Sequence, residues 1–197
     1  MRDLEGLPDD AVVLAHQLRI RGLLPDAEDD PTEVLCAAGF AQRKGALLAL
    51  TPDGRAAHAA WARIPEGSET EATVRRSYDA FLGLNVELLQ VSTDWQLRSG
   101  SIPNDHSDPT YDWAVIDRLA ALDERAGPLV RRVSSVNDRF IGYRPRMREA
   151  LRRVREGERE WFCSPRCDSY HTVWMQLHED LLLALGLERA AEELRAG

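Results

Sequence analysis

Three side chains near the C-terminus are of types that bind metal ions or transfer protons. Asp168 is followed by His171 three residues later and by His178 after a further seven. Asp168 and His171 could share a metal ion, but two imidazoles on one helix usually share one at a spacing of four, so no metal is predicted. We interpret the three as polar groups that bind a small molecule, with His171 and Asp168 as candidates for acid/base catalysis. Alternatively, the histidines are bonded to buried partners and hold helices in register.

A second group of this kind is the stretch Asn104-Asp-His-Ser-Asp108. In one interpretation it is a loop in which Asp108 caps the following helix and the other side chains are solvated. In the other, His106 and Asp105 face a pocket whose wall comes from the preceding segment and includes Asp94, Trp95 and Arg98. Because an imidazole gains or loses a proton near neutral pH, His106 is a further catalytic candidate.

The remaining reactive residues give weaker signals. Cys163 and Cys167 form a C-x3-C pair without a second pair, which is weak support for zinc and favours a structural role. Residues 144–155 are rich in arginine and are interleaved with glutamate, which is typical of a solvated helix with ion pairs, although contact with an anion is the alternative. No phosphate-binding glycine loop, nucleophile elbow or dinucleotide fingerprint occurs in the sequence, and no cofactor is predicted.

The candidates near the C-terminus lie in a segment whose apolar residues have helical spacing. Over residues 168–182 the apolar side chains recur at helical spacing and form one broad stripe: Tyr170, Val173, Trp174, Leu177 and Leu181. Because Asp168, His171 and His178 flank this stripe, they should lie where the helix meets its neighbours. The helix is therefore predicted to form the central wall of a pocket.

Four further helices are predicted in the same region. Their ranges are 69–98, 108–126, 129–140 and 146–155. Gly127-Pro128 separates the second from the third, because proline lacks the amide donor that a helix interior needs. Trp113 is assigned to the apolar side of the second helix. The polar stretch 65–71 is the predicted linker, and residues 72–197 form the predicted all-helical domain.

The N-terminal residues 1–64 are predicted to form a small domain containing both helices and strands. Helices are expected over 9–22 and 32–38, and two short strands should flank Lys44-Gly45. Thr51 as N-cap and Pro52 at the first helical position start another helix. The whole chain is thus expected to be mainly α, with a small α/β N-terminal domain and a C-terminal helical bundle.

The stretch Leu48-Ala-Leu-Thr-Pro-Asp-Gly-Arg55, after a helix ending in Ala-Gly-Phe, resembles the wing and following helix of MarR-like winged-helix regulators. The second domain resembles the actinobacterial members of that group, on three stretches: Thr93–Arg98, Pro103–Asp108 and Asp168–Trp174. The resemblance implies a winged-helix-like domain joined to a helical domain that binds a small molecule. It also implies a homodimer and contact with duplex DNA.

The chain departs from the winged-helix pattern between Gly22 and Gly39. A helix-turn-helix needs two helices there, and the acidic break in this segment leaves room for hardly more than one. The candidate recognition segment, residues 30–38, contains two acids and no basic residue, whereas base readout favours Arg, Lys, Asn or Gln. Arg43 and Lys44 at the predicted wing tip are the candidate phosphate contacts.

Composition limits the classes further. The formal charge is −8, and residues 1–70 contain 7 Lys/Arg against 12 Asp/Glu, which is unfavourable for binding nucleic acid. No apolar run reaches the roughly 18 residues of a membrane span, so no membrane partner is expected. The N-terminus has no apolar signal core and the three cysteines are an odd number, both of which favour the cytoplasm.

The leading hypothesis is a winged-helix regulator whose helical domain binds a small molecule. Its expected ligand-binding residues are Asp94, Trp95, Arg98, His106, Trp113, Tyr170, His171, Trp174 and His178. The alternative is an enzyme or ligand carrier derived from that scaffold, in which a histidine oriented by an aspartate acts as general acid or base. A third hypothesis is a structural or partner-binding protein whose polar residues only fix helix register.

Overall fold

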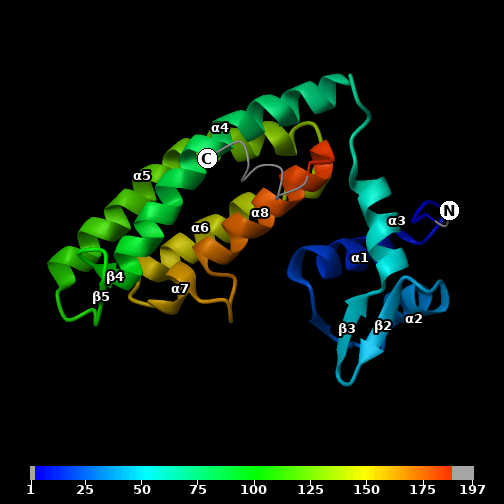
Figure 1. Cartoon of the computed structure of the whole chain (residues 1–197), viewed down its shortest axis with the longest axis horizontal. Coiled ribbons are helices and arrows are strands. Elements are labelled where there is room, and N and C mark those ends of the chain that lie inside the picture. Colours follow the sequence, from blue (N-terminus) through cyan, green and yellow to red (C-terminus); the bar gives the residue numbers. More distant parts are fainter. Residues whose placement is uncertain (1–2, 188–197) are drawn as a thin grey trace. The chain divides into compact units, whose positions relative to one another are not determined.

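The computed structural model describes residues 3–187, which form two compact units. The first unit contains the residues up to Pro65 together with the described residues from Leu182 onward, and the second contains Glu66–Leu181. The chain is mainly helical with a small antiparallel sheet (Figure 1). The division after Pro65 falls at the predicted linker, whereas the return of the chain to the first unit at Leu182 differs from the predicted domain 72–197.

The first unit combines three helices with a three-stranded sheet. Its elements are α1 (Asp9–Arg21), β1 (Leu24–Pro25), α2 (Asp30–Ala37), β2 (Ala41–Lys44), β3 (Leu47–Leu50) and α3 (Pro52–Ala62). The strand order is β1-β3-β2 and both pairings are antiparallel. Strand β1 was not predicted, because two residues, one of them proline, show no alternation. Gly45 has φ 65°, so the β2–β3 turn occupies the backbone region that favours glycine.

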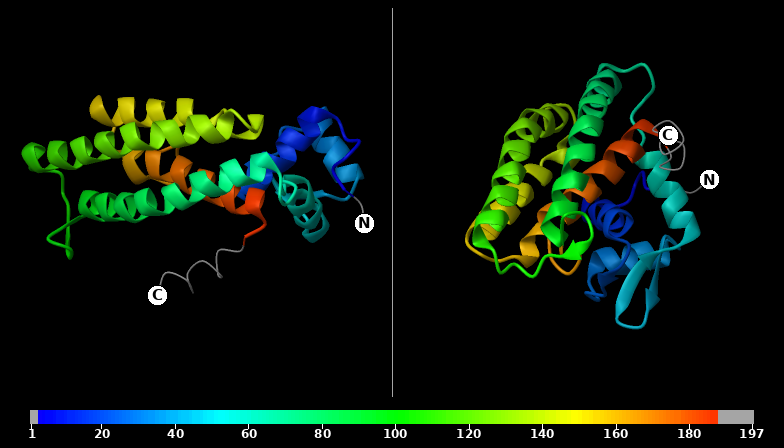
Figure 2. Two further views of the ribbon diagram at one scale, coloured as in Figure 1. Left: turned by 90° about the horizontal axis from the view of Figure 1, so that it is seen from above. Right: turned by 60° about the vertical axis from the view of Figure 1, so that its left-hand side comes forward.

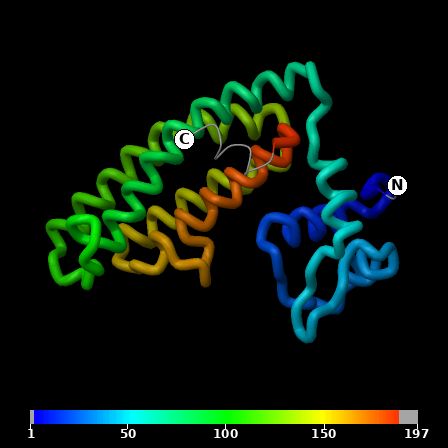
Figure 3. Tube along the Cα trace, viewed as in Figure 1, coloured from blue at the N-terminus to red at the C-terminus, as the bar shows by residue number. Residues whose placement is uncertain are grey.

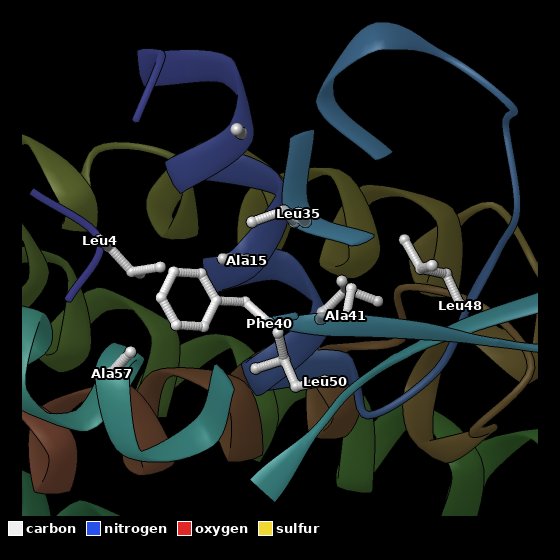
Figure 4. Packing of buried hydrophobic residues seen from close by; sticks show 10 residues of the cluster. Leu4, Ala15, Leu35, Phe40, Ala41, Leu48, Leu50 and Ala57 are labelled. Atoms are coloured by element: carbon white, nitrogen blue, oxygen red, sulfur yellow. The ribbon is translucent and has the colours of Figure 1, made fainter. Parts of the chain in front are cut away.

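The core of the first unit forms where α1, α2 and the sheet meet. Phe40 lies at its centre, with Leu4 and Leu50 around the ring (Figure 4). Leu18 of α1 and Leu35 of α2 are each 1% exposed or less. These side chains explain why the short helices are stable, since isolated helices of this length are marginal in water.

At the start of α3, the backbone of the Thr51–Gly54 segment packs closely against the backbone of Gly39 and Phe40. The Thr51 amide donates to the Phe40 carbonyl (2.9 Å), and the Thr51 hydroxyl donates to the Gly39 carbonyl (2.7 Å). The same hydroxyl oxygen accepts the Gly54 amide as an N-cap (3.0 Å). A Cβ at Gly54 would lie 1.9 Å from the Phe40 carbonyl oxygen. Position 54 therefore has space only for glycine.

We expect Gly54→Ala to destabilise the first unit by at least about 2 kcal/mol, because backbone atoms would have to move apart. Gly83→Ala is the matched control: Gly83 also lies inside a helix, but a Cβ there meets nothing within 4 Å. Its expected effect is a gain of about 0.5–1 kcal/mol. Chemical denaturation followed by circular dichroism measures both. Equal effects of the two substitutions would contradict the close contact.

The second unit consists of helices and one very short strand pair (Figures 1 and 2). Its elements are α4 (Glu69–Gln96), β4 (Leu97–Arg98), β5 (Ile102–Pro103), α5 (Pro109–Ser134), a 3-10 turn η1 (Asp138–Phe140), α6 (Tyr143–Arg155), α7 (Glu160–Cys163) and α8 (Tyr170–Leu185) up to Leu181. The last residues of α8, from Leu182, belong to the first unit. The long helices α4 and α5 run side by side in opposite directions, as the trace in Figure 3 shows. None of the described helices is both long and apolar enough to cross a membrane.

The predicted break at Gly127-Pro128 is wrong. Helix α5 continues through Pro128 to Ser134 and replaces two of the predicted helices. Packing outweighs the cost of about 3 kcal/mol that proline imposes inside a helix, since Ala126, Leu129 and Val130 are 5% exposed or less.

The predicted inward position of Trp113 is also wrong. Trp113 is 49% exposed, whereas the preceding Asp112 is 6% exposed. The helix presents the aspartate to the interior because that carboxylate has hydrogen-bond partners there. Periodicity of apolar residues alone had assigned the tryptophan to this side.

Candidate functional site

A polar site forms in the segment between α4 and α5. The strand pair β4–β5 aligns Leu97 with Pro103 and reverses the chain. The Asn104 amide then donates to the Gln96 carbonyl (2.8 Å), which fixes the start of the next segment. This places Asn104 and His106 beside the first turn of α5. We call Trp95, Asn104, His106 and Asp112 the His106 site.

His106 is held from several directions. Its Nδ1 lies 3.0 and 3.1 Å from the two carboxylate oxygens of Asp112. Asn104 Nδ2 donates to the same carboxylate (3.0 Å) and to the Trp95 carbonyl (3.1 Å). Asn104 Oδ1 accepts the His106 amide (3.2 Å). The backbone of His106 has φ 59°, a left-handed conformation that is uncommon for residues other than glycine.

The imidazole packs against Trp95 in a tilted arrangement, with ring centroids 4.5 Å apart, and Trp95 also stacks on Phe162. The His106 side chain is 20% exposed. Because Asp112 accepts from Nδ1–H, the neutral ring has its lone pair on Nε2. Within residues 3–187, no protein group is hydrogen-bonded to Nε2. The site therefore presents one oriented, partly exposed ring nitrogen.

The other candidates from this region have structural partners. Arg98 donates to Asp108 (2.7 Å) and lies over the Tyr111 ring, 4.8 Å from its centroid. The amide of Tyr111 and then Arg98 lower the pKa of Asp108. Asp94 pairs with Arg118 (2.6 Å). These contacts join the C-terminal end of α4 to the N-terminal part of α5 beside the His106 site.

The aromatic candidates of α8 lie in the core. Tyr170 and Trp174 are both 0% exposed. The Trp174 ring stacks on Phe81 (4.6 Å), and its Nε1 donates to Asn85 Oδ1 (2.9 Å). His178 is 6% exposed and packs against Phe81, with ring centroids 5.0 Å apart. Helix α8 is thus a central packing element of the second unit.

Asp168 and His171 differ in their surroundings. Asp168 accepts from Arg146 Nε (2.9 Å), just before α8 begins. His171 is half-buried, and burial lowers its pKa, so the ring is neutral at pH 7. No hydrogen bond between these two side chains is present. Among the described residues, no three His, Cys, Asp or Glu side chains are grouped as a metal would require.

The structure groups some of the candidates and separates others. Trp95 and His106 belong to one site, with Asp94 and Arg98 at its edge. Tyr170, Trp174 and His178 belong to the interior around α8, and Trp113 lies on the surface. Sequence reasoning did not assign roles to Asn104 and Asp112. A charged residue at the inward position of an apolar helix face is the signal that would have identified Asp112.

A pair of histidines in the first unit was also missed. His16 Nδ1 of α1 lies 3.0 Å from His58 Nε2 of α3, and their rings stack with centroids 5.3 Å apart. Trp61 tilts against both rings. His58 is 0% exposed. The two residues are 42 positions apart, so no local pattern connects them.

Fold and site together define a mainly helical protein with one preorganised histidine–aspartate pair. A scan against protein-family models, a search of curated proteins and a search of solved structures each gave no match.

Proposed function

We propose that this chain is a regulator-like protein whose second unit binds a small polar molecule at the His106 site. The observation that carries the proposal is the fixed imidazole of His106. Asp112 and Asn104 orient it, Trp95 supports it, and its Nε2 remains available to a ligand. A residue whose backbone is held in a left-handed conformation and whose ring is fixed by this many contacts is preorganised, which lowers the entropy cost of binding.

The first unit supports the resemblance to a winged helix through its element order and its β2–β3 hairpin, but not DNA readout through α2. A single helix lies between β1 and β2. Arg43 donates to Asp26 (2.6 Å) and to Glu33, which raises the pKa of its guanidinium and satisfies its charge within the unit. Helix α2 also begins with acids, Asp29 at its N-cap and Asp30 next. Phosphate groups would meet negative charge there.

We expect fluorescence anisotropy to show no preference of the full chain for its own upstream DNA over random duplex. Any residual binding should disappear as salt rises, as expected for contacts limited to Lys44 and similar surface charges. Sequence-specific binding that survives physiological salt would show that the first unit reads DNA despite its acidic helix.

The ligand hypothesis is tested on the purified full chain. Small molecules retained through purification are released by heat and identified by mass spectrometry. His106→Ala should reduce the retained amount at least about tenfold, the effect of losing one strong hydrogen bond. His171→Ala is the matched control, because it removes a half-buried imidazole from α8, and it should retain the ligand. Retention unchanged by His106→Ala, with melting temperatures equal to wild type, rejects the site.

General acid/base catalysis is the second candidate function, and the Nδ1–Asp112 hydrogen bond favours it. A carboxylate in this position fixes the tautomer that leaves Nε2 free to take a proton. Once the retained molecule is known, its conversion can be followed. Asp112→Asn should preserve binding but reduce conversion by at least about a hundredfold if His106 is a base. No conversion by the wild type leaves binding as the function.

A further inference from the structure

Arg159 lies beside the His106 site and was not among the predicted residues. It immediately precedes α7, and its Nη2 donates to the main-chain carbonyl of His106 (3.2 Å). This contact joins positions 53 residues apart. The guanidinium is consequently next to the loop that carries the imidazole, and its remaining N–H groups have no hydrogen-bond acceptor within the described part of the chain.

Three other arginines of this part of the chain are paired with acids. Arg152 and Arg153 each bind Glu149, and Arg146 binds Asp168. Arg159 differs, because no carboxylate among residues 3–187 lies within ion-pair distance of it. A carbonyl oxygen does not neutralise a guanidinium, so the positive charge of Arg159 remains available to bind an anion.

The acids near Arg159 are directed elsewhere. Asp105 accepts from the amide and hydroxyl of Ser107, Asp108 pairs with Arg98, and Asp112 binds His106. Glu158 pairs with Arg153. Glu160 forms no ion pair with Arg159 or any other residue of the described part of the chain. None of these groups neutralises Arg159.

We propose that Arg159 and His106 together bind an anionic group, a carboxylate or a phosphate, of the ligand at the His106 site. The inference rests on the proposed function and names the ligand class. A guanidinium matches the oxygens of either group with two parallel N–H donors. His106 contributes when its ring is protonated, because both ring nitrogens are then donors: Nδ1–H to Asp112 and Nε2–H to the anion.

The ion pairs at the site leave Arg159 without an acidic partner. With the ring protonated, the cations at the site are His106, Arg98 and Arg159, while the carboxylates are Asp105, Asp108 and Asp112. Two ion pairs are present, the inward-facing pair of Asp112 with His106 and the pair of Arg98 with Asp108. Asp105 is fully exposed and held by Ser107. Arg159 is the cation whose partner would come from the ligand.

Binding of two simple probes, inorganic phosphate and acetate, tests the inference on the full chain. Heteronuclear NMR follows the imidazole nitrogens of His106 as each probe is added at about pH 6 and about pH 8. At least one probe should shift Nε2, with tighter binding at the lower pH. Arg159→Gln should weaken that binding at least about fivefold, a loss in the range of one charge-assisted hydrogen bond. The probe that binds more tightly distinguishes phosphate from carboxylate.

Arg166→Gln is the matched control, because Arg166 is another exposed arginine close to α7 in sequence and has no ion pair among the described residues. It should leave probe binding unchanged. Equal weakening by both variants would indicate nonspecific charge attraction and would overturn the inference. So would an Arg159→Gln variant that binds both probes like the wild type.

The outcome is separable from that of the proposed function. If the retained molecule is neutral and still depends on His106, the anion inference fails while the binding function stands. If neither retention nor probe binding depends on His106, both fail. Retention of a carboxylate- or phosphate-bearing molecule that is lost in Arg159→Gln supports both.

Discussion

Replacing Trp174 with alanine is expected to lower the free energy of unfolding of the second unit by about 3–5 kcal/mol. The side chain is 0% exposed and stacks on Phe81 of α4. Its removal would leave a cavity in the interior and the Asn85 side chain without the donor that now binds it at 2.9 Å. Both effects act in the same direction, since surrounding atoms relax only partly around a deleted ring.

Two further variants separate the contributions. Trp174→Phe retains an aromatic ring but loses the hydrogen bond to Asn85, so its expected cost is smaller, about 1–2 kcal/mol. Trp113→Ala removes the same side chain from a site that is 49% exposed and should cost less than about 1 kcal/mol. Urea denaturation followed by tryptophan fluorescence and circular dichroism gives all three values. A ranking in which Trp113→Ala costs as much as Trp174→Ala would falsify the assignment of α8 to the core.

Replacing Arg144 with alanine is expected to destabilise the second unit by about 3 kcal/mol. Arg144 of α6 binds both carboxylate oxygens of Asp123 in α5, and the Tyr170 hydroxyl donates to the same carboxylate (3.1 Å). The side chains of Arg144 and Asp123 are 19% and 7% exposed. Removing the arginine leaves a buried carboxylate with only the phenol as its partner, and an uncompensated buried charge is costly.

The ion pair between Arg125 and Glu87 supplies the control. It also joins two helices, α5 and α4, but both of its side chains are largely exposed, at 52% and 40%. Arg125→Ala should cost at most about 1 kcal/mol, because solvent screens such a pair. The double variant Arg144→Met with Asp123→Leu should recover most of the lost stability, since neither charge remains buried. If it is as unstable as Arg144→Ala, the cost arises from packing and not from the unpaired charge.

Local patterns predicted the elements whose signals are local. Helix α4 begins at the predicted position, where the Ser68 hydroxyl accepts the Glu71 amide as an N-cap. The Thr51-Pro52 start of α3 is likewise confirmed. Where tertiary packing decides, local rules were wrong. Pro128 is tolerated inside α5, and β1 forms because β3 offers it a pairing edge.

The candidate site was predictable only in part, for the same reason. His106 and Trp95 could be named because their residue types and the turn between them are visible in one short stretch. The residues that contact them are either far away in the sequence or not recognisable from the sequence as buried. Arg159 contacts His106 but is 53 positions away in the sequence. Asp112 and Trp113 are neighbours in α5, and the sequence pattern does not show which of them faces the interior. Only the folded chain decides which of those two neighbours is buried.

The discontinuity of the first unit bears on the order in which the protein acquires structure during its synthesis. The Ile64 amide donates to the Ala184 carbonyl (2.9 Å), and both residues belong to the first unit. Domains generally fold in the order in which the ribosome releases them. Here the first 65 residues emerge early, yet part of their unit is translated only after the whole of Glu66–Leu181. Of the two units, the one that begins to emerge first is therefore the one that is completed last.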